Sequence, residues 1–400
     1  MLWLRLSFSR RLCYTHKIKG CADGRTQMDT ITQYVKKYGE YTFSEKPLSD
    51  VDSLVLCQFC YLKFDALVPD VREKGKAVSL WELAKSEAFD SMFADVRYEK
   101  KNRALFDAMV HSKRFGRMKV KDYINIIEPK RETQFSAVTF FLEDGTMYVA
   151  YRGTDENIVG WKEDFNMALE YPVPGQEYAL KYLNAVAARR RKEFYLGGHS
   201  KGGNLAVYAA MNCKFGLQER IIKVYSMDGP GFQPNVLEKE GYKRIEDRIV
   251  KILPHSSLVG MLFETAKEYK VVESKSFGPL QHDLYTWLIE GDDFLYVKDI
   301  YVSSRFAHDT FNEWVYSLDD EKRRLFVDTL YQVVAASKAQ NMIELGADWK
   351  KSMNAMITAM KEVDPKTRRA LKQIVKALFD ITWMRMRSTT SRQKTVKETK

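Results

Sequence analysis

Cysteine is scarce in this chain of 400 residues, which carries five, at positions 13, 21, 57, 60 and 213. The odd number and the scattered positions argue against a disulfide framework. Cys57 and Cys60 have the C-x-x-C spacing of many zinc and redox sites, but their neighbours are apolar and no second pair of Cys or His residues accompanies them. We therefore predict that both thiols face a hydrophobic core.

Long hydrophobic runs are missing as well. The opening segment MLWLRLSFS is too short for a membrane-spanning helix and is interrupted by Arg5, and no small-residue cleavage site follows to complete a secretory signal. We expect a cytoplasmic protein. Because residues 1–27 look unlike the rest of the chain, we predict a basic leader that is disordered or not native, with Met28 as a second candidate start.

An excess of positive charge is found at both ends of the chain. Lys and Arg total 64 against 53 Asp and Glu, which gives a formal net charge of +11, and the leader and residues 385–400 are both basic. These ends would interact weakly with anionic surfaces. No aromatic-basic motif accompanies the charge, so a specific nucleic-acid partner is not expected. Hydrophobic residues make up 45% of the chain, which is enough for a buried core.

Helical spacing dominates the first part of the chain. Apolar residues recur at three- and four-residue steps in residues 48–68, where Asp50 or Ser53 is a candidate cap, and again between residues 80 and 130. We predict that residues 28–130 are mainly helical and that these helices precede any strand.

The pattern changes near residue 135. Two β-rich runs flank Asp144-Gly145, a dipeptide typical of tight hairpin turns. Further β-like runs alternate with helical segments as far as residue 275, which predicts an α/β fold with a mostly parallel sheet core over residues 131–303. Amphipathic spacing then predicts a helical appendage over residues 304–384, packed on that core, and a basic disordered tail over residues 385–400.

Residues 194–210, FYLGGHSKGGNLAVYAA, contain the pattern G-x-S-x-G, formed by Gly198, Ser200 and Gly202. In this pattern a serine sits on a sharp strand-to-helix turn, and small flanking residues prevent steric clashes. The helix behind Ser200 would offer unsatisfied N–H groups, and the amide of Lys201 would be one donor for a developing oxyanion. The competing interpretation is a structural glycine-rich turn with an idle serine.

A serine nucleophile needs a base to take its proton. His282 follows the last β-like run, where the chain order serine, acid, histidine of α/β-hydrolases places the base. His255 and His308 are alternatives, and His199 would point away from the neighbouring serine. The chain has six histidines in all, at positions 16, 111, 199, 255, 282 and 308.

Asp228 is the candidate acid. It ends a predicted strand and precedes Gly229-Pro230-Gly231, a loop that would expose it at the carboxyl edge of the sheet. Asp-Gly-Pro is also good turn chemistry, so a turn-forming aspartate is the competing interpretation. Asp283 is less suited, because adjacent residues such as Asp283 and His282 rarely present their side chains in the required geometry.

The segment AYRGTDENIVGWKEDFNMAL, residues 150–169, resembles the oxyanion-loop region of class 3 (fungal-type) lipases. GGHSKGGNLA is similar to their nucleophile elbow, and VYSMDGPG to the strand and loop that follow it. More closely, residues 28 to about 340 resemble a bacterial lipase-like group described only as a domain of unknown function. This resemblance implies an α/β-hydrolase-like fold with Thr154 as the second oxyanion-hole residue, and with Trp161 and Asp164 bracing the loop. Arg152 belongs to the same motif, and an ion pair between Arg152 and Asp164 is an alternative.

Two positions depart from the lipase pattern. Ser257 stands where class 3 lipases carry their acid, so the acid comes from Asp228 or is absent, in which case Ser257 would orient the imidazole of a Ser200–His282 dyad. Lys201 stands where lipases usually carry an apolar residue. It would either attract an anionic group of the substrate or, as we expect, be a solvated lysine on the first helical turn.

These observations predict a serine hydrolase of lipase or esterase type that acts on a small-molecule or lipid ester and requires no metal or organic cofactor. The alternative is a weak or inactive hydrolase scaffold that acts as an interaction protein through its helical appendage. Fold alone does not define the substrate.

Overall fold

The computed structural model describes residues 28–131, 133–154, 171–257, 259–263 and 268–300, together with Glu163, Asn166, Met167 and single positions beyond residue 311. The predicted leader and tail lie outside the described residues. Of the predicted appendage, separate positions such as Asn312 and Arg324 are described, and both are helical.

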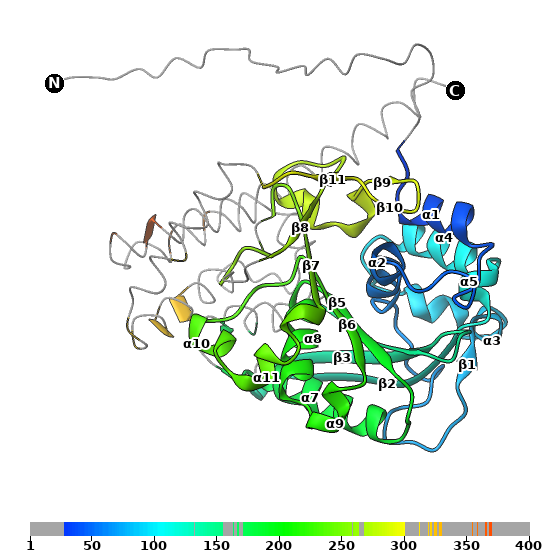
Figure 1. Cartoon of the computed structure of the whole chain (residues 1–400), viewed down its shortest axis with the longest axis horizontal. Coiled ribbons are helices and arrows are strands. Elements are labelled where there is room, and N and C mark those ends of the chain that lie inside the picture. Colours follow the sequence, from blue (N-terminus) through cyan, green and yellow to red (C-terminus); the bar gives the residue numbers. More distant parts are fainter. Residues whose placement is uncertain are drawn as a thin grey trace, which may run out of the picture.

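The first part of the described chain is a layer of short helices (Figure 1). The helix α2 begins where Ser49 and Asp52 form a capping box, in which the Ser49 hydroxyl accepts a hydrogen bond from the Asp52 amide and the Asp52 carboxylate accepts one from the Ser49 amide. The predicted caps, Asp50 and Ser53, were therefore wrong. The helices of this layer are α1 (Ile31–Tyr38), α2 (Asp50–Phe59), α3 (Leu80–Ala84), η1 (Phe89–Phe93), α4 (Glu99–Val110) and α5 (Lys113–Gly116).

The prediction that no strand precedes residue 131 was wrong. The strand β2 (Lys119–Glu128) pairs with the short β1 (Val78–Ser79) on one side and with β3 (Thr133–Phe141) on the other. The register of β2 shifts between Lys121 and Ile124, where Asp122 has a positive φ of 56°. Such a bulge interrupts the two-residue alternation by which a strand is recognised in sequence.

One nine-stranded sheet dominates the described residues, in the order β1-β2-β3-β4-β5-β6-β7-β8-β11. The five strands β4 to β8 are parallel to one another, whereas the pairs on both sides of them are antiparallel, so the predicted mostly parallel sheet is mixed as a whole. The remaining strands are β4 (Met147–Tyr151), β5 (Phe194–His199), β6 (Ile221–Met227), β7 (Ile249–Pro254), β8 (Lys270–Val272), β9 (Ile289–Glu290), β10 (Asp293–Phe294) and β11 (Tyr296–Val297).

The predicted hairpin at Asp144-Gly145 is confirmed. Strands β3 and β4 pair antiparallel, and Gly145 adopts the positive φ of 83° that a tight turn requires. The helices that follow lie mainly against the other face of the sheet from the first helical layer (Figure 1). They are α7 (Pro174–Ala188), α8 (Lys201–Asn212), α9 (Phe215–Gln218), α10 (Pro234–Leu237) and α11 (Glu240–Lys243), and single 3₁₀ turns are η2 (Pro129–Arg131), η3 (Glu246–Arg248), η4 (Gly278–His282) and η5 (Leu284–Thr286).

Two hydrophobic clusters form the core, one on each face of the sheet. Strand β4 contributes side chains to both clusters. Tyr148 and Ala150 pack toward the N-terminal helices, while Val149 and Tyr151 pack toward α7 and α8. This alternation is the two-residue period of a strand buried on both faces. The fold is therefore an α/β sheet covered on both sides.

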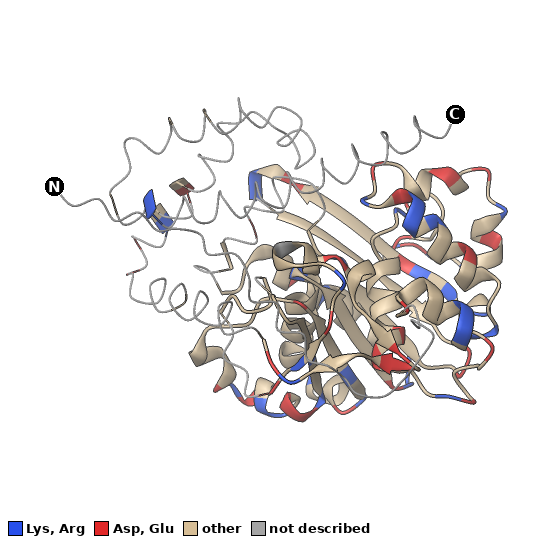
Figure 2. Ribbon diagram, turned by 90° about the horizontal axis from the view of Figure 1, so that it is seen from above, with Lys and Arg blue, Asp and Glu red and all other residues tan. Residues whose placement is uncertain are grey.

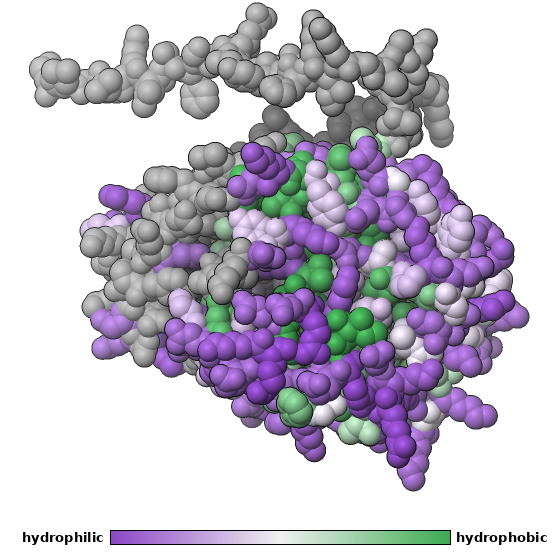
Figure 3. Space-filling view, viewed as in Figure 1, coloured by the Kyte–Doolittle hydropathy of each residue, from purple (hydrophilic) through white to green (hydrophobic). Residues whose placement is uncertain are grey.

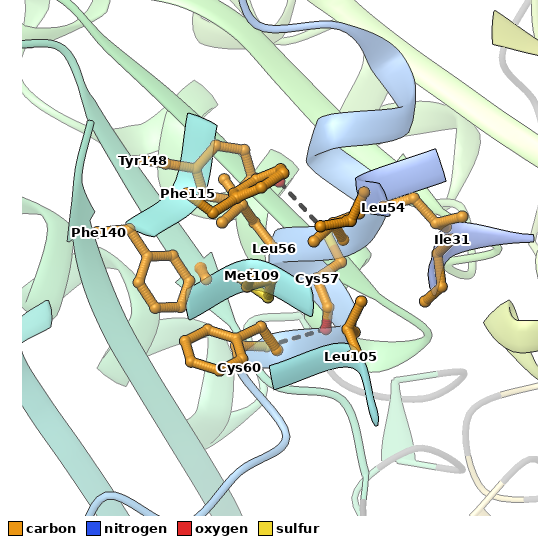
Figure 4. Packing of buried hydrophobic residues seen from close by; sticks show 14 of the residues in the cluster. Ile31, Leu54, Leu56, Cys57, Cys60, Leu105, Met109, Phe115, Phe140 and Tyr148 are labelled. Carbon is orange, nitrogen blue, oxygen red and sulfur yellow. Dashed lines mark hydrogen bonds between the residues drawn. The ribbon is translucent and has the colours of Figure 1, made fainter. Parts of the chain in front are cut away.

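The C-x-x-C thiols belong to the first of these clusters (Figure 4). Cys57 and Cys60 are free and buried, and the Cys57 Sγ lies 3.3 Å from the hydroxyl of Tyr148. Burial raises the pKa of the Cys57 thiol to about 12. The predicted core-facing role of both thiols is confirmed, and the described residues contain no group of metal-ligating side chains that includes them.

Basic and acidic residues are interspersed along the described helices, strands and loops (Figure 2). Hydrophilic residues cover most of the face seen in Figure 3, with small hydrophobic patches between them. Among the described helices, none has the length and hydrophobicity needed to cross a bilayer.

Candidate active site

Ser200 lies on a sharp turn between a strand and a helix. Strand β5 is buried along its whole length and ends at His199, and α8 begins at Lys201. Ser200 between them has φ 58° and ψ −131°, a conformation that costs energy for a residue with a Cβ atom. Its amide donates a hydrogen bond to the carbonyl oxygen of Met227 on β6, at 2.9 Å. The predicted strand, turn and helix around G-x-S-x-G are all present.

The two glycines of the pattern allow three backbone segments to meet. A Cβ atom on Gly198 would lie 2.2 Å from the carbonyl carbon of Gly202, and one on Gly202 would lie 2.1 Å from the carbonyl oxygen of Tyr151. No side chain tolerates such distances. The close approach of β4, β5 and α8 below Ser200 therefore depends on glycine at both positions.

Asp228 and His282 form a hydrogen-bonded pair at the same edge of the sheet. Asp228 follows β6, is fully buried and has a positive φ of 48°. His282 ends η4, and its Nδ1–H donates to Oδ2 of Asp228 at 2.6 Å. Because Nδ1 carries the proton in this bond, Nε2 is the nitrogen of a neutral His282 that can accept one.

Ser257 contacts the carboxylate of Asp228. The Ser257 hydroxyl donates to Oδ1 of Asp228 at 2.5 Å, and the amide of Gly260 donates to the same oxygen at 3.1 Å. A Cβ atom on Gly260 would lie 2.4 Å from that oxygen, so a larger residue would displace the donor. The Ser257 hydroxyl thus contacts the carboxylate of Asp228, and the expectation that Ser257 orients the imidazole of His282 stays a prediction.

His199 makes two contacts that were not predicted from the sequence, one with His282 and one with Tyr61. The ring of His199 lies 4.3 Å from that of His282, centroid to centroid, and its Nδ1 is 2.9 Å from the hydroxyl of Tyr61. Burial and the neighbouring His282 lower the pKa of His199 well below its usual value, so this ring stays neutral at pH 7. His199 was expected only to point away from Ser200. Tyr61 follows α2, far away in the sequence, and no local motif marks it.

Lys201 is buried, which corrects the expectation of a solvated side chain. Its Nζ donates to Oε2 of Glu163 at 2.8 Å and to the carbonyl oxygen of Gln134 at 2.9 Å. Both charged side chains are 1% exposed. An anionic group of a substrate would therefore not meet Lys201, because Glu163 already neutralises the ammonium group. No role was predicted for Glu163, which lies between Trp161 and Asp164 in the sequence.

The model of the Mbeg1-like family matches residues 109–332, more than half of the chain. The chain belongs to the Mbeg1-like family. This family is lipase-like and its function is unknown. The matched residues of this Mbeg1-like chain include Ser200, Asp228, Ser257 and His282, whereas Tyr61 lies outside the matched region. A comparison with curated proteins gives no match.

Two of the predicted supporting residues of this Mbeg1-like chain, Arg152 and Thr154, lie just after the end of β4. Thr154 is half-buried just after β4, and the buried Arg152 donates from Nη2 to Oδ1 of Asn125 at 2.8 Å. Trp161 and Asp164 lie outside the described residues. The bracing role of those two residues, and the alternative ion pair between Arg152 and Asp164, therefore stay predictions.

Of the alternative bases, His308 lies outside the described residues. His255 is buried, and the side-chain N–H of Gln281 donates to its Nε2 at 2.6 Å. Gln281 also accepts a hydrogen bond from the amide of Ser256, at 2.7 Å. Through these contacts His255 packs against the residue that precedes His282, which suits a structural role in holding that segment. Burial lowers the pKa of His255.

Asp283, the second carboxylate considered, is engaged elsewhere. It accepts a hydrogen bond from Nζ of Lys101 at 3.0 Å and one from the amide of Tyr285, also at 3.0 Å. The latter bond caps η5. Among these two carboxylates, Asp228 is the one that contacts the imidazole of His282.

Proposed function

We propose that this protein is a serine hydrolase of lipase or esterase type with an α/β-hydrolase-like fold. Ser200 is the nucleophile, His282 the general base and Asp228 the acid. The observation that carries the proposal is the 2.6 Å bond between His282 and Asp228 at the sheet edge where Ser200 occupies a strained strand-to-helix turn. A serine on such a turn, with a carboxylate-bound imidazole on a later segment, is the arrangement of an acyl-transfer site.

The residues divide the chemistry as follows. His282 takes the hydroxyl proton of Ser200 on Nε2 while Ser200 Oγ forms a bond to the acyl carbon, and Asp228 stabilises the resulting imidazolium through Nδ1–H. The amides of Lys201 and Thr154 hold the oxyanion. His282 then returns the proton to the leaving alcohol as the carbon–oxygen bond breaks. Water repeats the cycle and releases the acid, so no metal or organic cofactor enters the sequence of steps.

The neighbours of the pair support this division. Two donors, Ser257 and Gly260, point at Oδ1 of Asp228, which holds the carboxylate in place and leaves Oδ2 for the imidazole. The depressed pKa of His199 keeps a second positive charge away from His282. The alternative of an inactive scaffold was motivated by a missing acid at position 257, and Asp228 supplies a carboxylate in its place.

Covalent labelling with a fluorophosphonate probe tests the proposal. We expect the purified full-length chain to be labelled at Ser200 and the Ser200→Ala variant to remain unlabelled. Ser53→Ala is a matched control, because Ser53 is a buried serine that hydrogen-bonds Tyr148 in the helical layer. A folded wild-type chain that resists the probe would exclude the activated serine and return attention to the scaffold alternative.

The substrate class follows from a second measurement. A series of esters with increasing acyl length, assayed with wild type and Ser200→Ala, would separate a lipid substrate from a small-molecule one.

Truncation of residues 385–400 tests the predicted interaction of the basic tail with anionic surfaces. Unchanged ester hydrolysis with weaker binding to anionic vesicles would assign the tail a separate surface role.

A further inference from the structure

Lys201 and Glu163 join four segments of the chain beneath Ser200. Lys201 is the first residue of α8, and its Nζ reaches the carbonyl oxygen of Gln134 on β3. Glu163 accepts hydrogen bonds from the hydroxyl of Thr133 at 3.0 Å and from the amide of Gly175 on α7 at 2.8 Å. The starts of β3, α7 and α8 are therefore all connected to one carboxylate.

The burial of this pair costs free energy of folding. Taking both ions out of water costs several kcal/mol each, and apolar residues of the same volume often stabilise a protein equally well or better. The apolar residue that lipases usually carry at position 201 would avoid that cost. A buried ion pair is thus weak evidence for a role in stability, and its geometry is the more informative property.

The pair connects the two sides of the proposed oxyanion hole. The amide of Lys201 is one donor, and the Lys201 side chain is bound to Glu163. Glu163 belongs to the connection between β4 and α7, and the second donor, Thr154, lies near the start of the same connection. We expect displacement of the Lys201 side chain to shift its own amide at the start of α8, and displacement of Glu163 to shift the segment that also carries Thr154, so that either would change the separation of the two amides. Oxyanion stabilisation depends strongly on that separation, because the donors act at about 3 Å from the developing charge.

We propose that Lys201 and Glu163 are positioning residues, which hold the amides of Lys201 and Thr154 at the separation that the oxyanion requires. This inference rests on the proposed hydrolase function. Lys201, beside the nucleophile, would then help to set the catalytic geometry and would not attract a charged group of the substrate.

Three variants test the inference: Lys201→Met, Glu163→Gln and the double variant that carries both substitutions. Each single change leaves one buried charge without its partner, so each should lower both the melting temperature and kcat. The double variant removes both charges, so its melting temperature should recover relative to Lys201→Met. Its kcat should stay roughly 10- to 100-fold below wild type with KM changed less than about twofold, since misplaced donors affect the transition state and not substrate binding.

Asp122→Asn is a matched control for Glu163→Gln. Asp122 is another fully buried carboxylate, with Arg189 and Arg190 nearby on the β2 side of the sheet, and it has no contact with the proposed site. We expect this variant to keep the wild-type kcat whatever happens to its stability.

The rate of fluorophosphonate labelling provides the second measurement, because the phosphonyl oxygen occupies the oxyanion hole. A double variant with wild-type kcat and wild-type labelling rate would overturn the positioning role while the hydrolase function stands. If wild type itself were not labelled at Ser200, the hydrolase function would fall and the positioning role with it. Should the single variants not fold, the double variant decides the question, because its amide side chain at position 163 still offers an oxygen acceptor to Thr133 and Gly175.

Discussion

The Nδ1–H of His282 donates to the carboxylate of Asp228 across 2.6 Å, although the two residues are 54 positions apart in the chain. Replacing Asp228 by Asn should lower kcat by roughly 10³- to 10⁴-fold while the protein still folds, because an amide favours the wrong imidazole tautomer and cannot stabilise the imidazolium. Steady-state ester hydrolysis, with circular dichroism as the folding check, measures this. A loss of less than tenfold would show that Asp228 is not the acid.

A smaller effect is expected at Ser257. Ser257→Ala removes one donor from Oδ1 of Asp228, and the amide of Gly260 remains bound to that oxygen. We expect kcat to fall by about 3- to 10-fold, which corresponds to the net contribution of one typical hydrogen bond. Ser256→Ala is the neighbouring control. A loss as large as that of Asp228→Asn would favour a direct role of Ser257 on the imidazole.

Gly260→Ala should disturb the same carboxylate from the backbone side. The added methyl group would lie 2.4 Å from Oδ1 of Asp228 and 2.3 Å from a methyl carbon of Leu253. We expect a destabilisation of roughly 1–3 kcal/mol together with a lower kcat, because overpacking forces the backbone donor away. Urea denaturation and kinetics on the same sample measure both. Gly216→Ala, at a position open on all sides, should change neither.

Stability should decrease in mild acid because of His199. Burial lowers the pKa of His199 in the folded state, so between its usual value of about 6.5 and that lowered value the unfolded chain binds a proton that the folded chain does not. The free energy of unfolding should therefore fall by up to about 1.4 kcal/mol per pH unit for this residue as the pH decreases below about 6.5. Melting curves between pH 7.5 and 5 measure the slope, and His199→Asn should make it shallower. An equal slope in the variant would contradict this cause.

The buried thiols should be unreactive in the folded protein. Burial raises the pKa of Cys57 and of Cys213 to about 12, so almost no thiolate is present at pH 8. Iodoacetamide followed by mass spectrometry should modify neither residue before urea is added and both afterwards. Rapid modification of native Cys57 would indicate that the helical layer opens.

Several features of the fold were accessible from sequence because they depend on local chemistry. The hairpin at Asp144-Gly145 follows from the backbone freedom of glycine, and the turn at Ser200 follows from the small residues around it. Strand β2 was missed because its bulge at Asp122 breaks the alternation of the strand, and its assignment depends on pairing with β3. Neighbours far away in the sequence decided that element.

Sequence by itself determined the kinds of residue that can perform acyl transfer and the order in which they occur, since a nucleophile, a carboxylate and an imidazole are recognisable by type and by their place after predicted strands. Only the tertiary structure decided which of them meet. The bond of Asp228 to His282, the contact of Tyr61 with His199 and the burial of Lys201 against Glu163 all arise between distant segments. Their physical reason is the packing of a central parallel sheet, which gathers the carboxyl ends of its strands at one edge and removes water from the charges placed there.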